Sequence, residues 1–500
     1  MKKIQFEKAK NGGLTCSADG KFLHSKYNPQ KEAETFAVNL QIQNNPEYIV
    51  ITEPCISYSA ATIKEKFKSA KIAAIRFSHE FDQFNQEFSF VVYVSENETP
   101  QEIRSELIKK IGEKNILKTA FLQWIPAANA FPEQNAKTWA GIKSAAEYAR
   151  AILATNSCFS KRWFLNSIKN LAFAKEIFAL QKTNLPVVIA ASGRSLENSL
   201  EKLKKFRSSF FLIGVSSAVS VLLRQKIIPD FVISTDGGFW AKKHLEILKK
   251  FPEIPVALAL ESACPSFILK TNPVILLEYN DGFSKKMADF LNLTFPEAER
   301  NGTVSGTAVS LALKLTEKNI YVCGLDLHSA KGFQHTMPNS LEIFNARKDN
   351  KISGNEIRAA KSEFSSDALK IYENWFSDSK RNFKGRVFRL SENFPFKNNL
   401  NSVKDVNFDF FYKNEKIPPE NEKIENAEKM QKISVGKNIF PEIRKFTAEN
   451  SKTEEWLEEF FPAEMFALKN KTSTEEKQSF FSEICAKNKK FIEKIEKLLK

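Results

Sequence analysis

The sequence predicts an α/β protein whose central part is a doubly wound, mostly parallel and Rossmann-like sheet. A small α/β domain precedes this part, and a helical region follows it. The first observation is that short apolar runs alternate strictly with helical runs between residues 183 and 410. The second is that several of these runs are apolar throughout, as strands buried on both faces of a parallel sheet require. With 500 residues, 42% of them hydrophobic, the chain can form several domains.

The first predicted domain covers residues 1–120. The β-rich runs "EYIVITEP", "KIAAIRFS" and "FSFVVYVSE" are separated by the helical runs "TIKEKFKSA" and "PQEIRSELIKKIG". This alternation is typical of a small α/β domain. A helical connector is predicted over residues 121–182, because its Trp, Phe and Leu positions recur at three- and four-residue spacing.

The central α/β domain is predicted over residues 183–410, and residues 411–500 are predicted to be helical. The last segment is rich in Lys and Glu, with periodic Phe, Leu and Ile. Its amphipathic helices either cap the body of the protein or bind a partner. The predicted strands of the central domain are Val187–Ala191, Phe210–Val215, Asp230–Thr235, Val256–Leu260, Val274–Glu278, Ile320–Cys323 and Arg386–Leu390.

Composition narrows the functional class. The formal net charge of +15 is best explained by lysines that solubilise the surface, and it also suits an anionic partner such as nucleic acid, a nucleotide-sugar or an acidic protein. No compact Lys/Arg cluster with interleaved aromatic residues stands out, so nucleic-acid binding is not expected. The six cysteines form no C-x-x-C pair, which favours neither a zinc site nor a disulfide framework. No signal-peptide or membrane-spanning pattern is found, so we expect a cytoplasmic protein without membrane insertion.

A Ser-Gly-Arg-Ser turn follows the first strand of the central domain. Gly193 permits a tight turn or the close approach of a ligand. Ser195 is expected to cap the next helix by accepting a hydrogen bond from a free backbone N–H. Such a strand-to-helix corner favours anions, because unpaired N–H groups and the helix dipole point the same way. With one glycine, the turn alone is better explained as a structural corner.

Other strand ends strengthen the prediction of a nucleotide site. The segment "PDFVISTDG" delivers Asp236, and "CGLDLH" delivers Asp326 and His328, to the carboxyl edge of the sheet. Ligands of open α/β sheets bind at this edge. The segment "NGTVSGTA" opens a helix with small side chains that let backbone amides approach a phosphate. Its candidate phosphate-binding residues are Gly302, Thr303, Ser305 and Thr307.

These segments, in this order, resemble the central domain of the motility-associated factor (Maf) flagellin glycosyltransferases, the MptE-like domain family. The segment "LHSKYNPQKEAETF" is similar to the N-terminal signature of that family, and the resemblance covers roughly residues 20–410. It implies a cytoplasmic enzyme that transfers a nonulosonic acid, such as a pseudaminic-type sugar, from a CMP-activated donor to Ser/Thr of flagellin. Such activity supports flagellum assembly and motility. The central domain is also similar to GT-A-like bacterial sialyltransferases, which implies that no metal or other cofactor is needed.

The resemblance carries over to individual residues. Gly193, Ser195 and Leu196 match the Gly-Pro-Ser-Leu turn expected near the nucleotide, with Arg194 in place of the proline. Asp236 matches the acid of a Ser-x-Asp motif, expected to face the ribose or the reacting centre. The Gly/Ser/Thr turn described above matches the one expected to hold the donor phosphate.

Two histidines also receive roles from the resemblance. In the sialyltransferases, two tyrosines of the segment that matches "GLDLHSAKGFQH" contact the departing phosphate. His328 falls at the first tyrosine position, and His335 lies close to the second. The sialyltransferases use a later histidine as general base, but this chain has none after His335. Either His335 or Asp236 is therefore the base, or the chemistry differs. We prefer His335, which lies in a polar loop, and we expect Asp326 to orient its own loop.

Two other functions stay open at this point. A pterin pyrophosphokinase, a type found in the same domain family, would use ATP and Mg²⁺, and Asp236 and Asp326 could supply the metal-binding pair. A flagellin-binding chaperone with a decayed site is the other, because Arg194 and the missing late histidine depart from the family pattern. Only the CMP-sugar transferase predicts stabilisation by CMP without metal.

Overall fold

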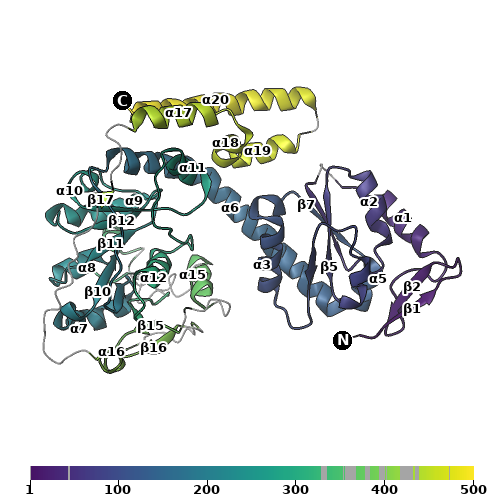
Figure 1. The fold of residues 1–500 in the computed structure, drawn as a ribbon, viewed down its shortest axis with the longest axis horizontal. Coiled ribbons are helices and arrows are strands. Elements are labelled where there is room, and N and C mark those ends of the chain that lie inside the picture. The colour runs from purple at the N-terminus through teal and green to yellow at the C-terminus, as the bar shows by residue number, and fades with distance from the viewer. Residues whose placement is uncertain are drawn as a thin grey trace. The chain divides into compact units, whose positions relative to one another are not determined.

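The computed structural model places residues 2–42, 46–327, 335–352, 354, 367–377, 383, 385–393, 400, 403–416, 432–433, 439–471 and 473–500 well enough to describe. The chain divides into two compact units (Figure 1). Unit 1 comprises Met1–Cys158 and Phe460–Ile484, and unit 2 comprises Phe159–Glu459 and Cys485–Lys500. The domain boundaries near residues 120, 182 and 410 stay predictions.

Unit 1 contains a four-stranded parallel sheet in the order β6-β5-β4-β7. In β4, Ile49 and Ile51 face one apolar cluster, whereas Val50 faces another. The strand is therefore covered on both faces, as its uninterrupted apolar run predicts. The strands of this sheet are β4 (Tyr48–Thr52), β5 (Lys71–Arg76), β6 (Val91–Tyr93) and β7 (Thr119–Gln123). A separate antiparallel sheet precedes them in the sequence and consists of β1 (Ile4–Lys8), β2 (Leu14–Ala18) and β3 (Lys21–Phe22).

Helices supply the rest of the unit 1 core. The capping box at Thr99, whose hydroxyl accepts from the Glu102 N–H while the Glu102 carboxyl accepts from the Thr99 N–H, starts α3 where the sequence predicts. The helices are α1 (Pro29–Asn39), α2 (Tyr58–Lys66), α3 (Pro100–Ile111), α4 (Glu113–Ile116), α5 (Ile125–Ala130), the first part of α6 (Pro132–Phe173) and α19 (Pro462–Lys469).

Unit 2 is built on a ten-stranded sheet in the order β16-β15-β14-β9-β10-β11-β12-β13-β8-β17. All described pairs are parallel except β17 with β8. The chain runs outward from β9 through β10 to β13 and then returns to place β14 on the other side of β9. This reversal is the topological switch point of a doubly wound sheet, which confirms the predicted fold class.

The predicted strands of the central domain are all present, and each end lies within one residue of its predicted position. Apolar runs therefore located the buried strands correctly. The strands of unit 2 are β8 (Ile177–Phe178), β9 (Val187–Ala190), β10 (Phe211–Val215), β11 (Phe231–Ser234), β12 (Val256–Ala259), β13 (Val274–Leu277), β14 (Ile320–Cys323), β15 (Val387–Leu390), β16 (Lys404–Val406) and β17 (Lys432–Ile433).

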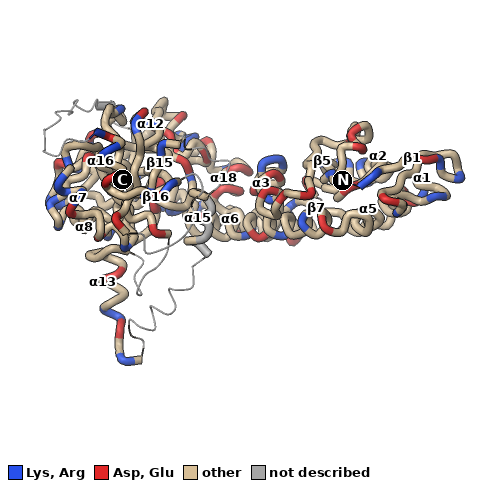
Figure 2. Tube along the Cα trace, turned by 90° about the horizontal axis from the view of Figure 1, so that it is seen from below, with Lys and Arg blue, Asp and Glu red and all other residues tan. Residues whose placement is uncertain are grey.

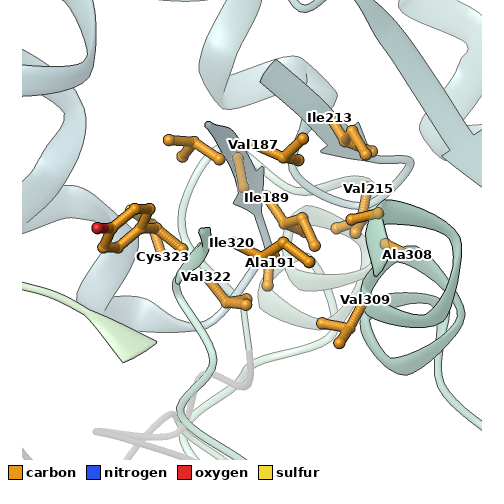
Figure 3. Packing of buried hydrophobic residues seen from close by; sticks show 14 of the residues in the cluster. Val187, Ile189, Ala191, Ile213, Val215, Ala308, Val309, Ile320, Val322 and Cys323 are labelled. Atoms are coloured by element: carbon orange, nitrogen blue, oxygen red, sulfur yellow. The ribbon is translucent and has the colours of Figure 1, made fainter. Parts of the chain in front are cut away.

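The helices of unit 2 cover the sheet, and α12 crosses its centre against β9, β10, β11 and β14. Figure 3 shows Ala308 and Val309 of α12 beside side chains of the strands, and all of them are buried. A helix between parallel strands runs back across the sheet, so α12 begins at the carboxyl edge. The helices are α7 (Leu200–Lys205), α8 (Val219–Arg224), α9 (Phe239–Leu245), α10 (Ile268–Thr271), α11 (Gly282–Phe290), α12 (Val304–Leu315), α13 (Ser340–Ala346), α15 (Asp367–Ser377) and α16 (Phe408–Glu415).

The C-terminal helices cap unit 2. These are α17 (Phe440–Asn450), α18 (Glu454–Phe460) and the end of α20 (Thr474–Leu498), and α17 and α20 run side by side (Figure 1). Trp456 of α18 is fully buried, with its ring centroid 5.4 Å from that of Phe164 and 5.1 Å from that of Phe283. The Trp456 Nε1–H donates to Asn488 Oδ1 at 2.9 Å. Of the two predicted roles, these contacts support the cap.

The long helices are amphipathic. In α20, Ile484, Phe491 and Ile495 are buried, whereas most of the Lys and Glu side chains between them are exposed. In the part of the chain that can be described, no helix combines the length and the apolar character needed to cross a membrane.

If the C-terminal helices cap unit 2, removing their central side chain should destabilise the protein. We predict that Trp456→Ala lowers the free energy of unfolding by about 3–5 kcal/mol, because it leaves a large cavity and an unpaired Asn488 oxygen. Phe481→Ala, at a side chain that is 43% exposed on the same helix α20 as Asn488, should change it by about 0.5 kcal/mol or less. Urea unfolding followed by circular dichroism measures both, and equal effects would contradict the cap.

Candidate functional site

The predicted site residues lie along the carboxyl edge of the unit 2 sheet. Gly193 and Ser195 follow β9, Asp236 follows β11, and Asp326 follows β14. Because β9 and β14 are neighbours, their ends meet directly. The end of β11 lies two strands from β9, or about 10 Å at the usual spacing between strands. The site therefore has two groups of residues on one edge.

The first group lies at the switch point between β9 and β14. The Ser195 N–H donates to Asp326 Oδ2 at 2.8 Å, and the Ser195 hydroxyl donates to Asp326 Oδ1. Both side chains are buried, at 4% exposed. Asp326 therefore holds the distant turn after β9, whereas the sequence predicted that it orients its own loop. The prediction that Ser195 caps the following helix is wrong, because its hydroxyl donates to this distant carboxylate rather than accepting a helix N–H.

Gly193 is needed because another backbone passes very close. A Cβ at this position would stand 2.5 Å from the Gly324 carbonyl oxygen and 2.6 Å from the Asp326 carboxyl carbon. The Gly193 N–H donates to the same Gly324 oxygen at 2.8 Å. The φ angle of Gly193 is −66°, so close approach, and not left-handed backbone, selects glycine here.

The segment that carries His335 is fastened to the same turn. The Thr336 N–H donates to the backbone carbonyl oxygen of Ser192 at 2.7 Å, and the Thr336 hydroxyl donates to the backbone carbonyl oxygen of Gly193. Beyond it, Asn339 caps α13 by accepting from the N–H groups of Leu341 and Glu342. The predicted catalytic histidine is therefore next to the predicted nucleotide turn, although the two are far apart in the sequence.

His335 has a buried carboxyl partner. Its Nδ1 lies 3.1 Å from Glu342 Oε1, and Glu342 is 2% exposed. When Nδ1–H donates to this carboxyl oxygen, Nε2 keeps a free lone pair, so the ring can accept a proton. The ring centroid of His244 lies 6.4 Å from that of His335. Burial, and then the neighbouring His335, lower the pKa of His244 to about 4, so His244 stays neutral near pH 7.

The second group includes the start of α12. The Thr303 hydroxyl accepts from the Gly306 N–H at 3.1 Å and caps the helix. Thr307 is 2% exposed, and its hydroxyl hydrogen bond is shared between the backbone carbonyl oxygens of Glu299 and Thr303. The Thr307 hydroxyl is thus engaged within the protein. Ser305 is half-buried in the first helical turn, where backbone N–H groups lack intrahelical acceptors.

Asp236 and Gly302 are linked by Tyr372 of α15. A Cβ at Gly302, whose φ is +82°, would stand 3.0 Å from the Tyr372 ring. Burial and then the charge of Asp236 raise the pKa of Tyr372, which places its phenol in the electrostatic field of that carboxylate. Asp236 is exposed, and its Oδ1 accepts from the Gly238 N–H at 2.9 Å.

The end of α6 holds the loops after β11 and β12. Asn166 Nδ2 donates to the backbone carbonyl oxygens of Gly237 and Glu261, at 3.3 and 3.0 Å. One turn later, Asn170 Nδ2 donates to the oxygens of Leu260 and Ser262, both at 2.9 Å. Trp163 leaves room only for a glycine at position 237. This helical stripe fixes the strand ends that carry Asp236.

The cations near this edge of the sheet differ in whether a carboxylate pairs with them. The Arg300 guanidinium lies 3.0 Å from Glu261, 2.9 Å from Asp281 and 4.1 Å above the Tyr279 ring. By contrast, burial and then the charge of Lys242 lower the pKa of Lys169, and neither lysine has an acidic partner among the described residues. Two cations without a carboxylate between them favour binding of an anion.

The candidate metal pair does not fit a shared ion. Asp236 and Asp326 follow β11 and β14, which are three positions apart in the sheet, so the ends of these strands lie about 14 Å apart. A Mg²⁺ ion holds its oxygen ligands at about 2 Å. Within the described ranges there is also no group of three or more His, Cys, Asp and Glu side chains arranged around a metal position.

Three further residues lie in the segments that carry the family resemblance: His328, Arg194 and His24. His328 lies outside the described residues. Arg194 is half-buried, and its guanidinium lies 3.4 Å from Glu197 on the next turn. His24 is 2% exposed in unit 1, where its Nε2 accepts from the Ile56 N–H.

Sequence reasoning missed several residues of the site. Glu342 stands three positions after Asn339, and this Asn-x-x-Glu pattern signals a helix start. It does not signal that the carboxyl meets His335. Tyr372 and the Asn166/Asn170 pair gave no local signal, because only the folded sheet brings them to the strand ends.

The chain is similar to known proteins in the region that contains this site. The family model described as 6-hydroxymethylpterin diphosphokinase MptE-like matches residues 162–332. Over these residues the chain is similar to that family. The matched segment begins in the part of α6 that carries Asn166 and Asn170 and runs through the switch point, so it contains Asp236, Asp326 and the start of α12. The predicted resemblance to the MptE-like family is confirmed over these residues.

A solved structure shares the fold. The Maf glycosyltransferase from Magnetospirillum magneticum AMB-1 superposes with a TM-score of 0.50 at 15% identity, over 81% of this chain and 70% of that one. Two uncharacterized proteins of Treponema pallidum (strain Nichols) are similar in sequence. One is 32% identical over 283 residues, or 56% of this chain and 62% of the relative. The other is 29% identical over 113 residues, or 22% of this chain and 53% of the relative. The chain spans less than two thirds of either relative.

The close approach of the Gly324 backbone to Gly193 predicts the effect of adding a methyl group at position 193. Gly193→Ala should lower the free energy of unfolding by about 1–3 kcal/mol, because the Gly324 backbone cannot move away cheaply. Gly354→Ala is the control, since among the described residues its Cβ would meet the Asn350 carbonyl oxygen at 3.5 Å, an ordinary contact distance. Urea unfolding compares the two, and a neutral Gly193→Ala would refute the contact.

The depressed pKa of His244 predicts a dependence of stability on pH. Between its unfolded value of about 6.5 and its folded value of about 4, the unfolded chain binds one more proton. Stability is therefore present above pH 6.5 and lost as the pH falls towards 4, by about 3 kcal/mol. His244→Gln should remove this part of the pH dependence. Urea unfolding at pH 7 and pH 4.5 measures it, and identical slopes in both proteins would contradict the burial of a neutral imidazole.

Proposed function

We propose that this chain is a glycosyltransferase that moves a nonulosonic sugar from a CMP-activated donor to Ser/Thr of flagellin. The observation that carries the proposal is the fastening of His335, with its buried partner Glu342, to the turn Ser192–Ser195 at the switch point. A candidate general base thereby stands beside the place where doubly wound sheets bind nucleotides. Cytoplasmic location and a role in motility are parts of the same proposal.

The other residues of the edge support an anionic donor. Small residues open α12, where backbone N–H groups and the helix dipole favour a phosphate. The half-buried Lys169 and Lys242 add positive charge. Most carboxylates nearby are already engaged: Asp326 by Ser195, Glu342 by His335 and Glu261 by Arg300. The edge thus retains donors and cations for a ligand.

The proposed reaction is a single substitution at the anomeric carbon. The acceptor hydroxyl oxygen bonds to that carbon while the bond to the CMP phosphate breaks, and CMP leaves with the electron pair. The hydroxyl proton passes to Nε2 of His335, whose ring is oriented by Glu342 at Nδ1. Asp236, exposed at the end of β11, is the alternative base. The fold similarity to a Maf glycosyltransferase supports this class of reaction.

The pterin pyrophosphokinase is the second candidate, because the matched family model bears that description. Its metal pair, Asp236 and Asp326, follows strands that are three positions apart in the sheet, and Asp326 already accepts two hydrogen bonds from Ser195, so a shared ion is disfavoured. We therefore favour the transferase, and a ligand test distinguishes the two.

The test has a binding arm and a turnover arm. CMP without metal should raise the melting temperature, by the equivalent of about 2.7 kcal/mol at a hundred times its Kd. Stabilisation only by ATP with Mg²⁺ would replace the proposal with the kinase, and no response to CMP, CTP or ATP would favour the flagellin-binding chaperone.

For turnover, the purified chain is incubated with a CMP-activated nonulosonic acid and unglycosylated flagellin, and intact flagellin mass is measured. His335→Ala should lower transfer by about 10²–10⁴-fold, while stabilisation by CMP persists. Glu342→Gln should cause a smaller loss, because the ring is less well oriented but still present. Glu201→Gln, at an exposed position of α7, is the matched control. Full transfer by His335→Ala would remove this histidine from the mechanism.

A further inference from the structure

Three aromatic side chains form an exposed surface between α9 and α13. Phe239 is 60% exposed and Phe344 is 43% exposed. The Trp240 ring joins them, with its centroid 5.3 Å from that of Phe239 and 5.2 Å from that of Phe344. Single exposed apolar residues are common, but a contiguous aromatic cluster drawn from two elements marks a surface that binds something. We name Phe239, Trp240 and Phe344 the aromatic surface.

The aromatic surface is continuous with the histidine site. Trp240 and His244 are four residues apart on α9, so they share one face of the helix. On α13, Phe344 and Glu342, the partner of His335, are two residues apart and lie on different faces of the helix, so the connection to the histidine site runs along α9. The Ser340 hydroxyl donates to the Lys243 oxygen and ties the two helices together. The surface therefore begins about one helical turn, roughly 5.4 Å, from the paired histidines.

Basic side chains border the aromatic surface. Lys348 Nζ lies 4.0 Å from the Phe344 centroid, whereas Lys243 Nζ, 5.6 Å from the Phe239 centroid, is paired with Glu246 Oε1 at 2.7 Å. Arg347 and Lys348 are exposed at the end of α13. Figure 2 shows α13 standing out from the body of unit 2, with basic residues towards its far end. The matching partner presents apolar side chains together with carboxylates.

We propose that the aromatic surface docks the acceptor polypeptide, through a segment that carries apolar and acidic side chains, and so delivers an acceptor hydroxyl to His335. This inference rests on the proposed function. A second copy of the chain is a poor occupant, since each copy carries a formal net charge of +15 and would bring the same basic rim. Trp and Arg side chains, represented here by Trp240 and the nearby Arg347, are enriched among the residues that dominate binding at protein interfaces.

The test measures the affinity for unglycosylated flagellin from the organism that encodes the chain. Phe239→Ser and Phe344→Ser, combined, should weaken binding at least tenfold, as loss of central aromatic anchors does. Lys348→Glu should weaken it at low salt and much less at high salt. Phe410→Ser is the matched control, because this α16 side chain is 39% exposed away from α9 and α13. Stabilisation by CMP is measured on every variant.

Each outcome bears on the proposal. Weakened flagellin binding with normal stabilisation by CMP supports it. Unchanged flagellin affinity in the double variant overturns it, as does a loss of CMP stabilisation in that variant, which would assign the surface to the donor. Light scattering that shows a wild-type dimer dissociated by Phe344→Ser would assign it to self-association and also overturn it. If wild-type protein binds flagellin through this surface but responds to no nucleotide, the docking stands and the transferase falls.

Discussion

The contact between the chain after β9 and the chain after β14 is the constraint on which the site depends. Gly193 donates to Gly324, and a side chain on Gly193 would collide with that backbone. Asp326 then fixes the turn through Ser195. Thr336 bonds to the carbonyl oxygens of the same turn, so the position of His335 follows from it. A parallel sheet that reverses its winding direction at β9 is what brings these segments together.

The electrostatics of the edge follow from how its carboxylates are used. Asp326, Glu342 and Glu261 are all buried, and each is held by donors within the protein. A buried carboxylate stabilises the contact between the segments that supply it and its donors, because losing a donor would leave the charge desolvated and unpaired. The excess positive charge of the chain is then left to act on ligands and partners. This division explains how an edge with several acids can suit an anionic donor.

The sequence predicted the fold more completely than the site. Buried strands are written locally as apolar runs, so the strands of unit 2 were located to within one residue. The prediction for Ser195 failed because its partner, Asp326, is 131 positions away and competes successfully with the helix N–H groups. His335 was singled out from its polar loop, but the carboxyl that orients it and the neighbouring His244 emerged only from the packing of α9 against α13.

The sequence by itself determined where strands and helices begin, which residues follow the strand ends, and that these ends carry Gly, Ser/Thr and Asp. These features depend on side-chain periodicity and turn chemistry over a few residues. Only the tertiary structure decided that β14 lies beside β9, that β11, which Asp236 follows, lies two strands from β9, and that Phe344 meets Trp240. Strand order and helix packing are long-range choices, made by burying apolar faces against one another, and no short stretch of sequence records them.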